Sequence, residues 1–535
     1  MCNDPVDKLL FRFHIDSETA VIDRLRQAHP RWTENDGICS RCIDYYHTEI
    51  VREQRLLPEI GPYFPVRSVD DFVILPTPLR LDANPRFTGK GVTICFIDSD
   101  FFPHPDLTSH YNRIKAMVDI TESGASDQTD GQWHGTMTSV VCAGDGYLSN
   151  GLYKGIASEA NLVLLKVQDN TGRILQTNII KALEWVLENH ALYGIRIVNM
   201  SVGDNEPESY KESKIDQLAE ALIEKGITVV AAVGNTEDGQ IKPPANGLHV
   251  IAVGGINDDN RLNAGKTAYH STYGRTTDAL MKPELVAQAI WIAAPILPGT
   301  SVQKEAALLH DLLQHADEAL VDALERNIAH TKLDSALPSV TDPGFIRGKI
   351  IERIQRGKFI APHYMHADGT SFAAPIVSAV VAQLIECNPL LSPAGIRHIL
   401  FSSAKRLDSI APERQGYGMI QPRKAILQAL KQHSNENAGQ SPYIDNQNQV
   451  IEFSIRSSCA SQVVLTGPFN QWATQTHPLQ PCKDGWWKIS IPLLAPGKYH
   501  YKFLIDENNW AEDTANPFRE PDGIAGFNSV LLIEN

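Results

Sequence analysis

The segment GTSFAAP, Gly369 to Pro375, leads into a run of almost wholly apolar residues that continues to Ile385. Such a run predicts a buried helix, and the helix has to end near Asn388, because a residue that precedes proline avoids helical backbone angles. Ser371 therefore lies where a rigid helix begins, among backbone N–H groups, which is a setting for a nucleophile. A serine needs a general base and a group that orients the base, so this interpretation depends on partners elsewhere in the chain.

Two upstream segments supply those partners. His134 begins another apolar segment of small residues, and Gly135 beside it leaves room for a substrate or another backbone. Asp98 ends the β-branched run 91–98, which is typical of a buried parallel strand, and open α/β sheets place their chemistry at that end of a strand. Asp100 puts a second carboxylate nearby, so the sequence favours Asp98 as the orienting group and leaves Asp100 as the alternative.

Each residue alone has an ordinary structural alternative. Gly-Thr-Ser is often a turn before a helix, a single histidine is usually structural, and an aspartate after a strand can cap a helix. Together, in the order aspartate, histidine, serine, they follow the order found in subtilisin. On these motifs the region 89–430 resembles a subtilisin-like serine protease, or subtilase. The resemblance implies a catalytic triad of Asp98, His134 and Ser371, an acyl-enzyme and a protein or peptide substrate.

A fourth motif adds to this resemblance. Asn235, after a strand-like apolar run, stands where the family has its oxyanion-hole asparagine, and the backbone N–H of Ser371 would be the second donor. The segment 199–203 resembles the family's substrate-pairing strand, to which an extended peptide adds by main-chain hydrogen bonds, and this favours an endopeptidase over an esterase. The implied substrate-binding residues are Ser201, Val202, Gly203, Ala232 and Gly234. Two departures leave the reacting groups intact: Asp100 replaces a common glycine, and Phe372 replaces a common methionine.

Strand-like and helical segments alternate through the same region. Strand-like runs cover 161–167, 195–202, 227–233 and 249–253, and helical patterns cover 177–192 and 210–225. Strands that alternate with helices predict a parallel sheet covered on both faces. We therefore expect an α/β fold, with a subtilisin-like catalytic domain over 86–430 and a C-terminal immunoglobulin-like β-sandwich.

Composition limits the remaining classes. A chain of 535 residues exceeds the size of a single core, and its net charge of −15 argues against nucleic acid as a partner. We expect no membrane span, because no apolar run reaches about 18 residues. The first 14 residues lack the apolar core and the cleavage site of a secretory signal, so we expect a cytoplasmic protein whose eight cysteines are reduced thiols.

The N-terminal region 1–85 carries one weak motif. Cys39 and Cys42, with His47 following, have the spacing of half a zinc site, and Cys2 could be a third ligand. The simpler interpretation is two thiols in a small α/β segment, so we expect no metal or cofactor, while structural zinc or calcium stays open. The region lies where subtilases carry a propeptide, and it is either propeptide-like or accessory.

An insertion interrupts the protease pattern over 300–365. Apolar residues recur at helical spacing and predict one long helix, followed by a shorter helix over 344–357. The recurring residues are Leu309, Leu313, Ala316, Leu320 and Leu324. We expect the insertion to bury this stripe on the protease body as a surface hairpin, and the alternative is a lid, partner site or dimer surface near the nucleophile.

A polar linker over 431–447 separates a second unit, 448–535, in which short alternating strands replace helices. Its motifs, such as GPFNQW at 467–472 and DGWW at 484–487, resemble the glycogen-binding-type module of the AMP-activated kinase β subunit and of isoamylase-type enzymes. The resemblance implies a glycogen-like α-glucan as a partner. The sugar-contacting residues that it implies are Trp472, Lys502, Trp510 and Asn528. The alternative is that these tryptophans, together with Trp486 and Trp487, fill the sandwich core, and Gly526 replaces a polar residue often found in that family.

Three functions fit the sequence. The first is an intracellular serine endopeptidase whose C-terminal module docks a glucan or a protein. The second is a catalytically silent scaffold built on a subtilase fold. The third is a glycan-associated protease that acts only on polymer-bound proteins. The sequence predicts neither the cleavage preference nor the oligomeric state.

Overall fold

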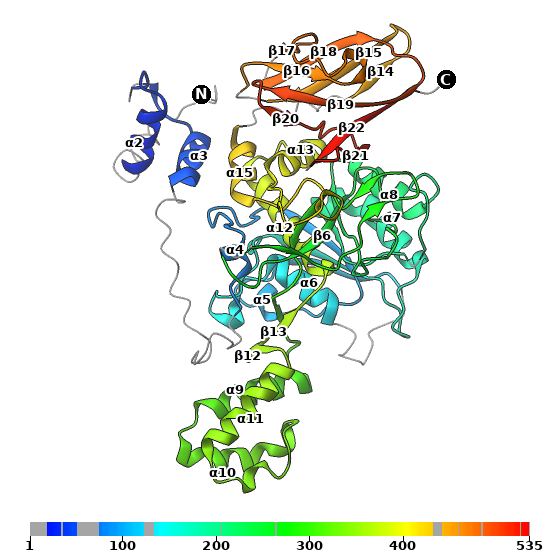
Figure 1. Cartoon of the computed structure of the whole chain (residues 1–535). Coiled ribbons are helices and arrows are strands. Elements are labelled where there is room, and N and C mark those ends of the chain that lie inside the picture. Colours follow the sequence, from blue (N-terminus) through cyan, green and yellow to red (C-terminus); the bar gives the residue numbers. More distant parts are fainter. Residues whose placement is uncertain are drawn as a thin grey trace.

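The computed structural model describes residues 19–33, 36–50, 74–121, 133–204, 206–262, 265–431, 441–457, 460–482, 485–524 and 526–533. A central α/β domain carries a helical insertion at one end and a β-sandwich at the other, with two N-terminal helices at its side (Figure 1). Of the sequence motifs, Cys2, Asp484 and most of the polar linker lie outside the described residues.

A parallel sheet forms the centre of the α/β domain, in the order β10-β6-β5-β4-β1-β3-β2, and β7 pairs antiparallel with β6. Its strands are β1 (Thr93–Asp98), β2 (Ile114–Asp119), β3 (Asn161–Lys166), β4 (Ile195–Met200), β5 (Thr228–Ala232), β6 (Ile251–Asn257), β7 (Thr267–Ala268) and β10 (Leu285–Gln288). The predicted runs contain β1, β3, β4 and β5 and cover only the start of β6, and no run is predicted for β2, β7 or β10. The predicted parallel α/β fold is confirmed.

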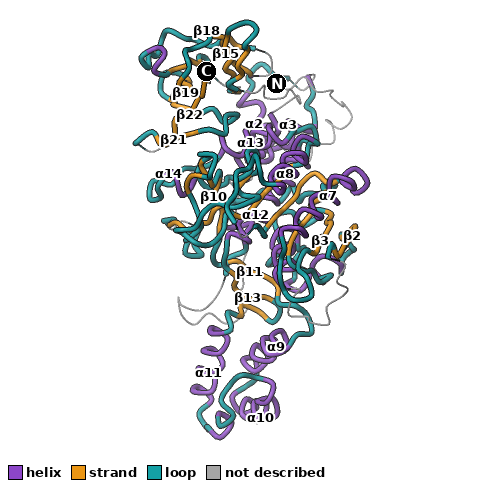
Figure 2. The backbone as a smooth tube through the Cα atoms, turned by 90° about the vertical axis from the view of Figure 1, so that its right-hand side faces the viewer, coloured by secondary structure: helices purple, strands orange, loops and turns teal. Residues whose placement is uncertain are grey.

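Helices cover both faces of this sheet, as Figure 2 shows. On one face lie α6 (Trp133–Ala143) and α12 (Thr370–Cys387), and on the other lie α7 (Gln176–Tyr193) and α8 (Lys214–Glu224). Successive side chains of β1 enter opposite cores: Ile94 and Phe96 pack beneath α6 and α12, while Cys95 and Ile97 pack beneath α7 and α8. A strand buried on both faces therefore reads as a continuous apolar run.

The helix α12 is longer than the sequence predicts, since it begins at Thr370 and includes Pro375. Its 18 residues have a mean hydropathy of 1.5, so by length and composition it could cross a membrane, contrary to the expectation that no run is long enough. However, 83% of that window is buried inside the protein. It is the central core helix of the α/β domain, and it ends at Asn388 as predicted.

Shorter elements complete the domain. They are α4 (Thr77–Arg80), α5 (Pro105–Thr108), α13 (Pro393–Ser403), α14 (Pro412–Gln415), α15 (Pro422–Lys431), β8 (Gly274–Arg275), β9 (Met281–Lys282), β11 (Ile292–Pro295), β12 (Phe359–Ala361) and β13 (Tyr364–Ala367). The N-terminal helices are α2 (Thr19–Ala28) and α3 (Ser40–Ile50). The helix α3 packs against α15: Arg41 donates to the carbonyl of Ala429, and Lys431 lies over the ring of Tyr45.

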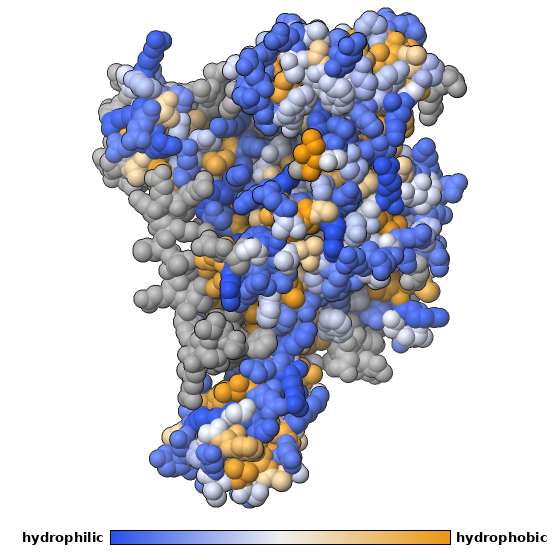
Figure 3. Space-filling model, viewed as in Figure 1, coloured by the Kyte–Doolittle hydropathy of each residue, from blue (hydrophilic) through white to orange (hydrophobic). Residues whose placement is uncertain are grey.

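The insertion contains α9 (Ser301–Gln314), α10 (Asp317–Asn327) and α11 (Pro343–Arg356). The prediction of one long helix is wrong, because Ala316 has an extended backbone that separates α9 from α10. The expectation that the stripe packs on the protease body is also wrong. The apolar residues of the three helices form a core of their own. Among the described residues, Ile296, Phe359 and Met365 connect this core to the protease body. The insertion projects from the domain (Figure 1) and keeps apolar residues at its surface as well (Figure 3).

The C-terminal unit is a sandwich of two antiparallel sheets. One sheet has the order β14-β15-β18-β17, and the other has the order β16-β19-β22-β21 with β20 paired to β19. The strands are β14 (Tyr443–Asp445), β15 (Val450–Arg456), β16 (Val463–Thr466), β17 (Gln480–Pro481), β18 (Trp486–Pro492), β19 (Gly497–Ile505), β20 (Asn509–Ala511), β21 (Arg519–Pro521) and β22 (Phe527–Ile533). Residues such as Phe453, Tyr501 and Phe503 fill the space between the sheets, and the predicted β-sandwich is confirmed.

Candidate active site

Asp98 and His134 meet at the carboxyl end of β1. Asp98 is fully buried, and its Oδ1 accepts a hydrogen bond from His134 Nδ1 at 2.6 Å. The same carboxylate accepts from the backbone N–H of Ser99 at 2.7 Å and from the hydroxyl of Thr138 at 3.0 Å. Burial lowers the pKa of His134, but the charge of Asp98 and its hydrogen bond raise this pKa by more, so the net shift is upward. With Nδ1 bound to Asp98, Nε2 is the nitrogen that can take a proton from a nucleophile.

The second carboxylate, Asp100, faces away from the histidine. Its Oδ1 accepts from the N–H of Phe101 at 2.7 Å, and its Oδ2 lies 3.6 Å from Lys166 Nζ. Burial raises the pKa of Asp100, against the opposing effects of these two partners. Gly135 is required here, because a Cβ at that position would lie 2.5 Å from the carbonyl oxygen of Asp100. The close approach inferred from this glycine is therefore that of another backbone.

Ser371 is the second residue of α12, which begins at Thr370 directly after Gly369. Gly369 has a φ of 139°, which favours glycine, and its N–H donates to the carbonyl of Ala289 at 2.7 Å. Ser371 and His134 line the same cavity. Among the described residues no hydrogen bond joins the Ser371 hydroxyl to His134. Such contacts are often long without substrate and tighten when it binds.

Asn235 follows β5 and is oriented by the first residue of α12. Its Oδ1 accepts from the N–H of Thr370 at 2.8 Å and from the Thr370 hydroxyl at 3.0 Å. The amide nitrogen Nδ2 lies above Gly369, 3.6 Å from where a Cβ would be. Because the oxygen of this amide is engaged twice, the nitrogen is the group left to donate toward a substrate near Ser371.

A chain of buried polar side chains fixes the serine from beneath. Ser378 on α12 donates to Asn199 Oδ1 at 2.9 Å, and Asn199 Nδ2 donates to Ser201 Oγ at 3.2 Å. Ser201 Oγ in turn donates to the carbonyl of Ser371 at 2.9 Å. The sequence places Ser201 only in a substrate-pairing strand, and it misses this positioning role. The signal that could have revealed it is the polar Asn199 inside a strand that is otherwise apolar.

Two cavities flank the serine. One, of about 660 Å³, is lined by the segments after β4 and β5, and it contains all the substrate-binding residues that the resemblance implies: Ser201, Val202, Gly203, Ala232 and Gly234. The other, of about 760 Å³, lies between His134 and the base of the insertion, where Ile296, Val302 and Met365 line it. Ser371 and Asn235 border both cavities, so an extended chain that passes the serine would occupy one on each side.

The tryptophans of the sandwich divide into two pairs. Trp486 and Trp487 are 7% and 8% exposed: Trp487 belongs to the sandwich core, while the ring centroid of Trp486 lies 6.5 Å from that of His398 on α13. Trp472 and Trp510 are 36% and 47% exposed, and their ring centroids lie 6.5 Å apart at an interplanar angle of 57°. The alternative that all four fill the core is therefore wrong for this second pair. Lys502 and Asn528 line the same cavity as this pair.

Within the described residues, no group of three or more histidine, cysteine, aspartate or glutamate side chains is arranged to hold a metal ion. Neither Cys39 nor Cys42 forms a disulfide among the described residues, and Cys42 donates its backbone N–H to the sulfur of Cys39 at 3.4 Å.

An α/β domain that places aspartate, histidine and serine at one edge of a parallel sheet defines a serine hydrolase. The family model of the subtilase family (Peptidase S8) matches residues 89–418, and the chain belongs to this family. The model of carbohydrate-binding module 48 (isoamylase N-terminal domain) matches residues 439–519. The protein is therefore a serine endopeptidase with a C-terminal carbohydrate-binding module.

Individual relatives are similar over parts of the chain. Serine protease AprX of Bacillus subtilis (strain 168) is 27% identical over 349 residues, which are 63% of this chain and 67% of AprX. Subtilisin Savinase of Lederbergia lenta is 30% identical over 196 residues, 36% of this chain and 65% of Savinase. The solved structure of fervidolysin from Fervidobacterium pennivorans is 16% identical with a TM-score of 0.47, and the match covers 79% of this chain and 54% of fervidolysin.

Proposed function

We propose that the protein is a cytoplasmic endopeptidase that cleaves protein or peptide substrates with Asp98, His134 and Ser371, and that its C-terminal module binds an α-glucan. The observation that carries the catalytic part is the joint geometry at the edge of the sheet. Asp98 holds Nδ1 of His134, while Thr370 holds the amide oxygen of Asn235. These contacts leave His134 Nε2 and Asn235 Nδ2 as the nitrogens available to act near the serine.

The reaction follows from these positions. The Ser371 hydroxyl attacks the scissile carbonyl carbon and passes its proton to His134 Nε2, and Asp98 stabilises the resulting imidazolium. The carbonyl oxygen becomes negatively charged and accepts hydrogen bonds from Asn235 Nδ2 and from the N–H of Ser371. His134 then protonates the leaving amine. Water, deprotonated by the same histidine, releases the acyl group and restores the serine hydroxyl.

The glucan part rests on the exposed pair Trp472 and Trp510. Aromatic faces stack on sugar rings, and two rings tilted by 57° suit a curved chain better than a flat surface. Beside them Lys502 Nζ is held by Asp522 Oδ2 at 2.6 Å, so its direction is fixed, and Asn528 supplies an amide. Such fixed donors suit recognition of sugar hydroxyls.

A covalent probe tests the catalytic part. A fluorophosphonate should label the wild-type protein but not Ser371→Ala, and a peptide library read by mass spectrometry should be cleaved only by the wild type. Ser403→Ala is the matched control, because it removes a buried hydroxyl of α13 that donates to the carbonyl of Leu400 and lines neither cavity beside the serine, so it should keep the serine reactive. A folded wild type that is neither labelled nor active would favour the scaffold alternative. Fractionation of the native cells tests the cytoplasmic location.

Co-sedimentation with glycogen tests the glucan part. The full-length protein should pellet with glycogen, and Trp510→Ala should reduce the bound fraction without changing the melting temperature. A wild type that stays in the supernatant would refute glucan binding and favour a protein-contact role for the module.

A further inference from the structure

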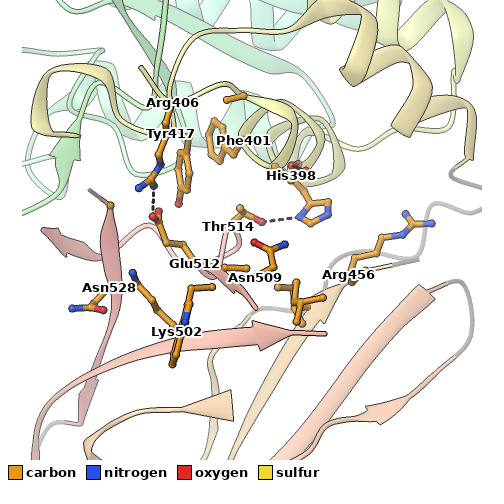
Figure 4. Close-up of a pocket in the computed structure, with 18 of the residues that line it drawn as sticks. His398, Phe401, Arg406, Tyr417, Arg456, Lys502, Asn509, Glu512, Thr514 and Asn528 are labelled. Carbon is orange, nitrogen blue, oxygen red and sulfur yellow. Dashed lines mark hydrogen bonds and ion pairs between the residues drawn. The ribbon is translucent and has the colours of Figure 1, made fainter. Parts of the chain in front are cut away.

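The side chains proposed to contact the sugar are exposed within a cavity and not on the outer face of the sandwich. Trp472, Lys502, Trp510 and Asn528 line a cavity of about 1200 Å³ that lies between the sandwich and the catalytic domain. Its opposite wall is formed by α13, α15 and the segment that follows α13 (Figure 4). We call this cavity the interdomain cleft.

The two walls of the interdomain cleft are held together by buried contacts. Arg519 of the sandwich is 3% exposed and donates to the catalytic-domain carbonyls of Met281 at 3.2 Å and Pro283 at 2.9 Å. At the back of the cleft, His398 Nδ1 lies 2.7 Å from Thr514 Oγ1 (Figure 4). A buried arginine that loses its partners is costly, so these contacts fix the catalytic wall at a set distance from the sugar-contacting residues.

Arg406 reaches from the catalytic wall into the sandwich. Its guanidinium pairs with Glu512 (Figure 4). It also lies 5.8 Å from the ring centroid of Phe527. A Cβ at Gly526 would lie 2.1 Å from Arg406 Nη1, so the guanidinium occupies the space that a side chain at 526 would fill. The catalytic domain thus places a planar group of donors at Gly526, where the sandwich itself has no side chain.

Two neutral polar groups of the catalytic wall also line the interdomain cleft. The Ser402 hydroxyl has one hydrogen, which it shares between Gln428 Oε1 at 2.9 Å and the carbonyl oxygen of His398 at 2.7 Å. The engaged oxygen leaves the Gln428 amide nitrogen as a donor, and the serine oxygen can still accept. These groups match the hydroxyls of an uncharged sugar.

We propose that the catalytic domain forms the second wall of the sugar site, so that a single linear α-glucan chain is held in the interdomain cleft between Trp472 and Trp510 on one side and Ser402, Gln428 and Arg406 on the other. This inference rests on the proposed glucan binding by the module. It adds that the protease domain itself recognises the sugar, and that the chain enters between two domains instead of lying on an open face.

Binding of maltohexaose to the full-length protein, measured by isothermal titration calorimetry, tests the two walls separately. Trp510→Ala removes a stacking face of the sandwich and reports on glucan binding itself. Ser402→Ala/Gln428→Ala removes the neutral groups of the catalytic wall, and Ser402→Arg narrows the cleft from the same wall. Lys424→Ala is the matched control, because Lys424 is exposed on α15 and lies outside the cleft.

If the catalytic domain forms the second wall, Ser402→Ala/Gln428→Ala should lose at least about 5-fold in affinity for maltohexaose. Each lost hydrogen bond weakens binding by a factor of about 2 to 12, and the double variant loses two. Ser402→Arg should also weaken binding, and Lys424→Ala should bind as the wild type does. A loss in either variant of the catalytic wall supports the proposal. If Trp510→Ala weakens binding while both of these variants bind like the wild type, the second wall is refuted and glucan binding stands. If the wild type does not bind, both proposals fail.

Discussion

Replacing Asn235 by leucine removes the amide that we propose as the oxyanion donor while nearly preserving side-chain volume. The bond from Asn235 Nδ2 forms mainly in the transition state, so we expect kcat to fall by about 10²–10³, the range measured for one such donor in subtilisin, with little change in KM. This loss corresponds to about 2.7–4 kcal/mol of transition-state stabilisation.

The structure predicts a smaller fall in kcat when Thr370, which orients this amide, is replaced. Thr370→Val removes the 3.0 Å bond from the hydroxyl to Asn235 Oδ1 but keeps the 2.8 Å bond from the backbone N–H. A hydrogen bond contributes about 0.5–1.5 kcal/mol net, so kcat should fall by a factor of about 2 to 12. Thr228→Val is the matched control: Thr228 is a buried threonine of β5 whose hydroxyl has no partner among the described residues, so its removal should leave kcat unchanged.

Steady-state kinetics on a quenched peptide substrate, normalised by fluorophosphonate titration of the active serine, gives kcat and KM for each variant. If Asn235→Leu raises KM while kcat holds, Asn235 is a substrate contact and the oxyanion assignment is wrong. If Thr370→Val lowers kcat as much as Asn235→Leu does, the amide of Asn235 is not oriented by two separate hydrogen bonds.

The raised pKa of His134 predicts that kcat/KM falls as the pH drops through a value above the ordinary histidine pKa, because only the neutral imidazole acts as base; a pH profile measures this inflection. Asp98→Asn should reduce kcat by about 10⁴ and move the inflection to lower pH, and an unmoved inflection would contradict the assignment of Asp98. Leu320→Ala in the core of the insertion should cost about 2–5 kcal/mol of local stability, seen as faster hydrogen exchange in α9–α11, while peptidase activity persists; loss of activity would show that the insertion supports the site. In the sandwich, Trp487→Ala should cost about 3–5 kcal/mol whereas Trp510→Ala should leave the melting temperature unchanged, and equal destabilisation of the two variants would contradict their different burial.

The sequence predicts the central domain well because its signals are local. The apolar run of β1 is buried on both faces, and glycines such as Gly135 and Gly369 mark places where backbones approach closely or take an unusual angle. The choice between Asp98 and Asp100 is harder, since both follow the same strand. Only the direction of each side chain, set by the partners Thr138 and Lys166, separates them.

Other features depend on contacts between distant segments. The apolar spacing continues through Ala316 without a proline or glycine, so the sequence gives no sign of the break between α9 and α10. Which tryptophans of the sandwich face outward depends on how its strands and turns are placed. Trp472 lies in a turn with a φ of 59°, and the local pattern does not distinguish it from the buried Trp487. The position of the face that carries Trp472 and Trp510 against the catalytic domain depends on Arg519, whose partners lie more than 230 residues away.

The central helix α12 has a consequence for how the two ends of the protein could work together. Ser371 lies in its first turn, and after its last turn the chain continues into α13, which borders the interdomain cleft. At 1.5 Å per residue, its 18 residues span about 27 Å, so the nucleophile lies about that far from the end of α12 that leads into α13. In Figure 1 the helix α13 lies on the side of the domain that carries the sandwich. If the protein were anchored to a polysaccharide particle through the interdomain cleft, its active site would face the surrounding solution. Its substrates would then be proteins that diffuse in from the solution. Proteins bound to the particle surface under the enzyme would not reach the active site.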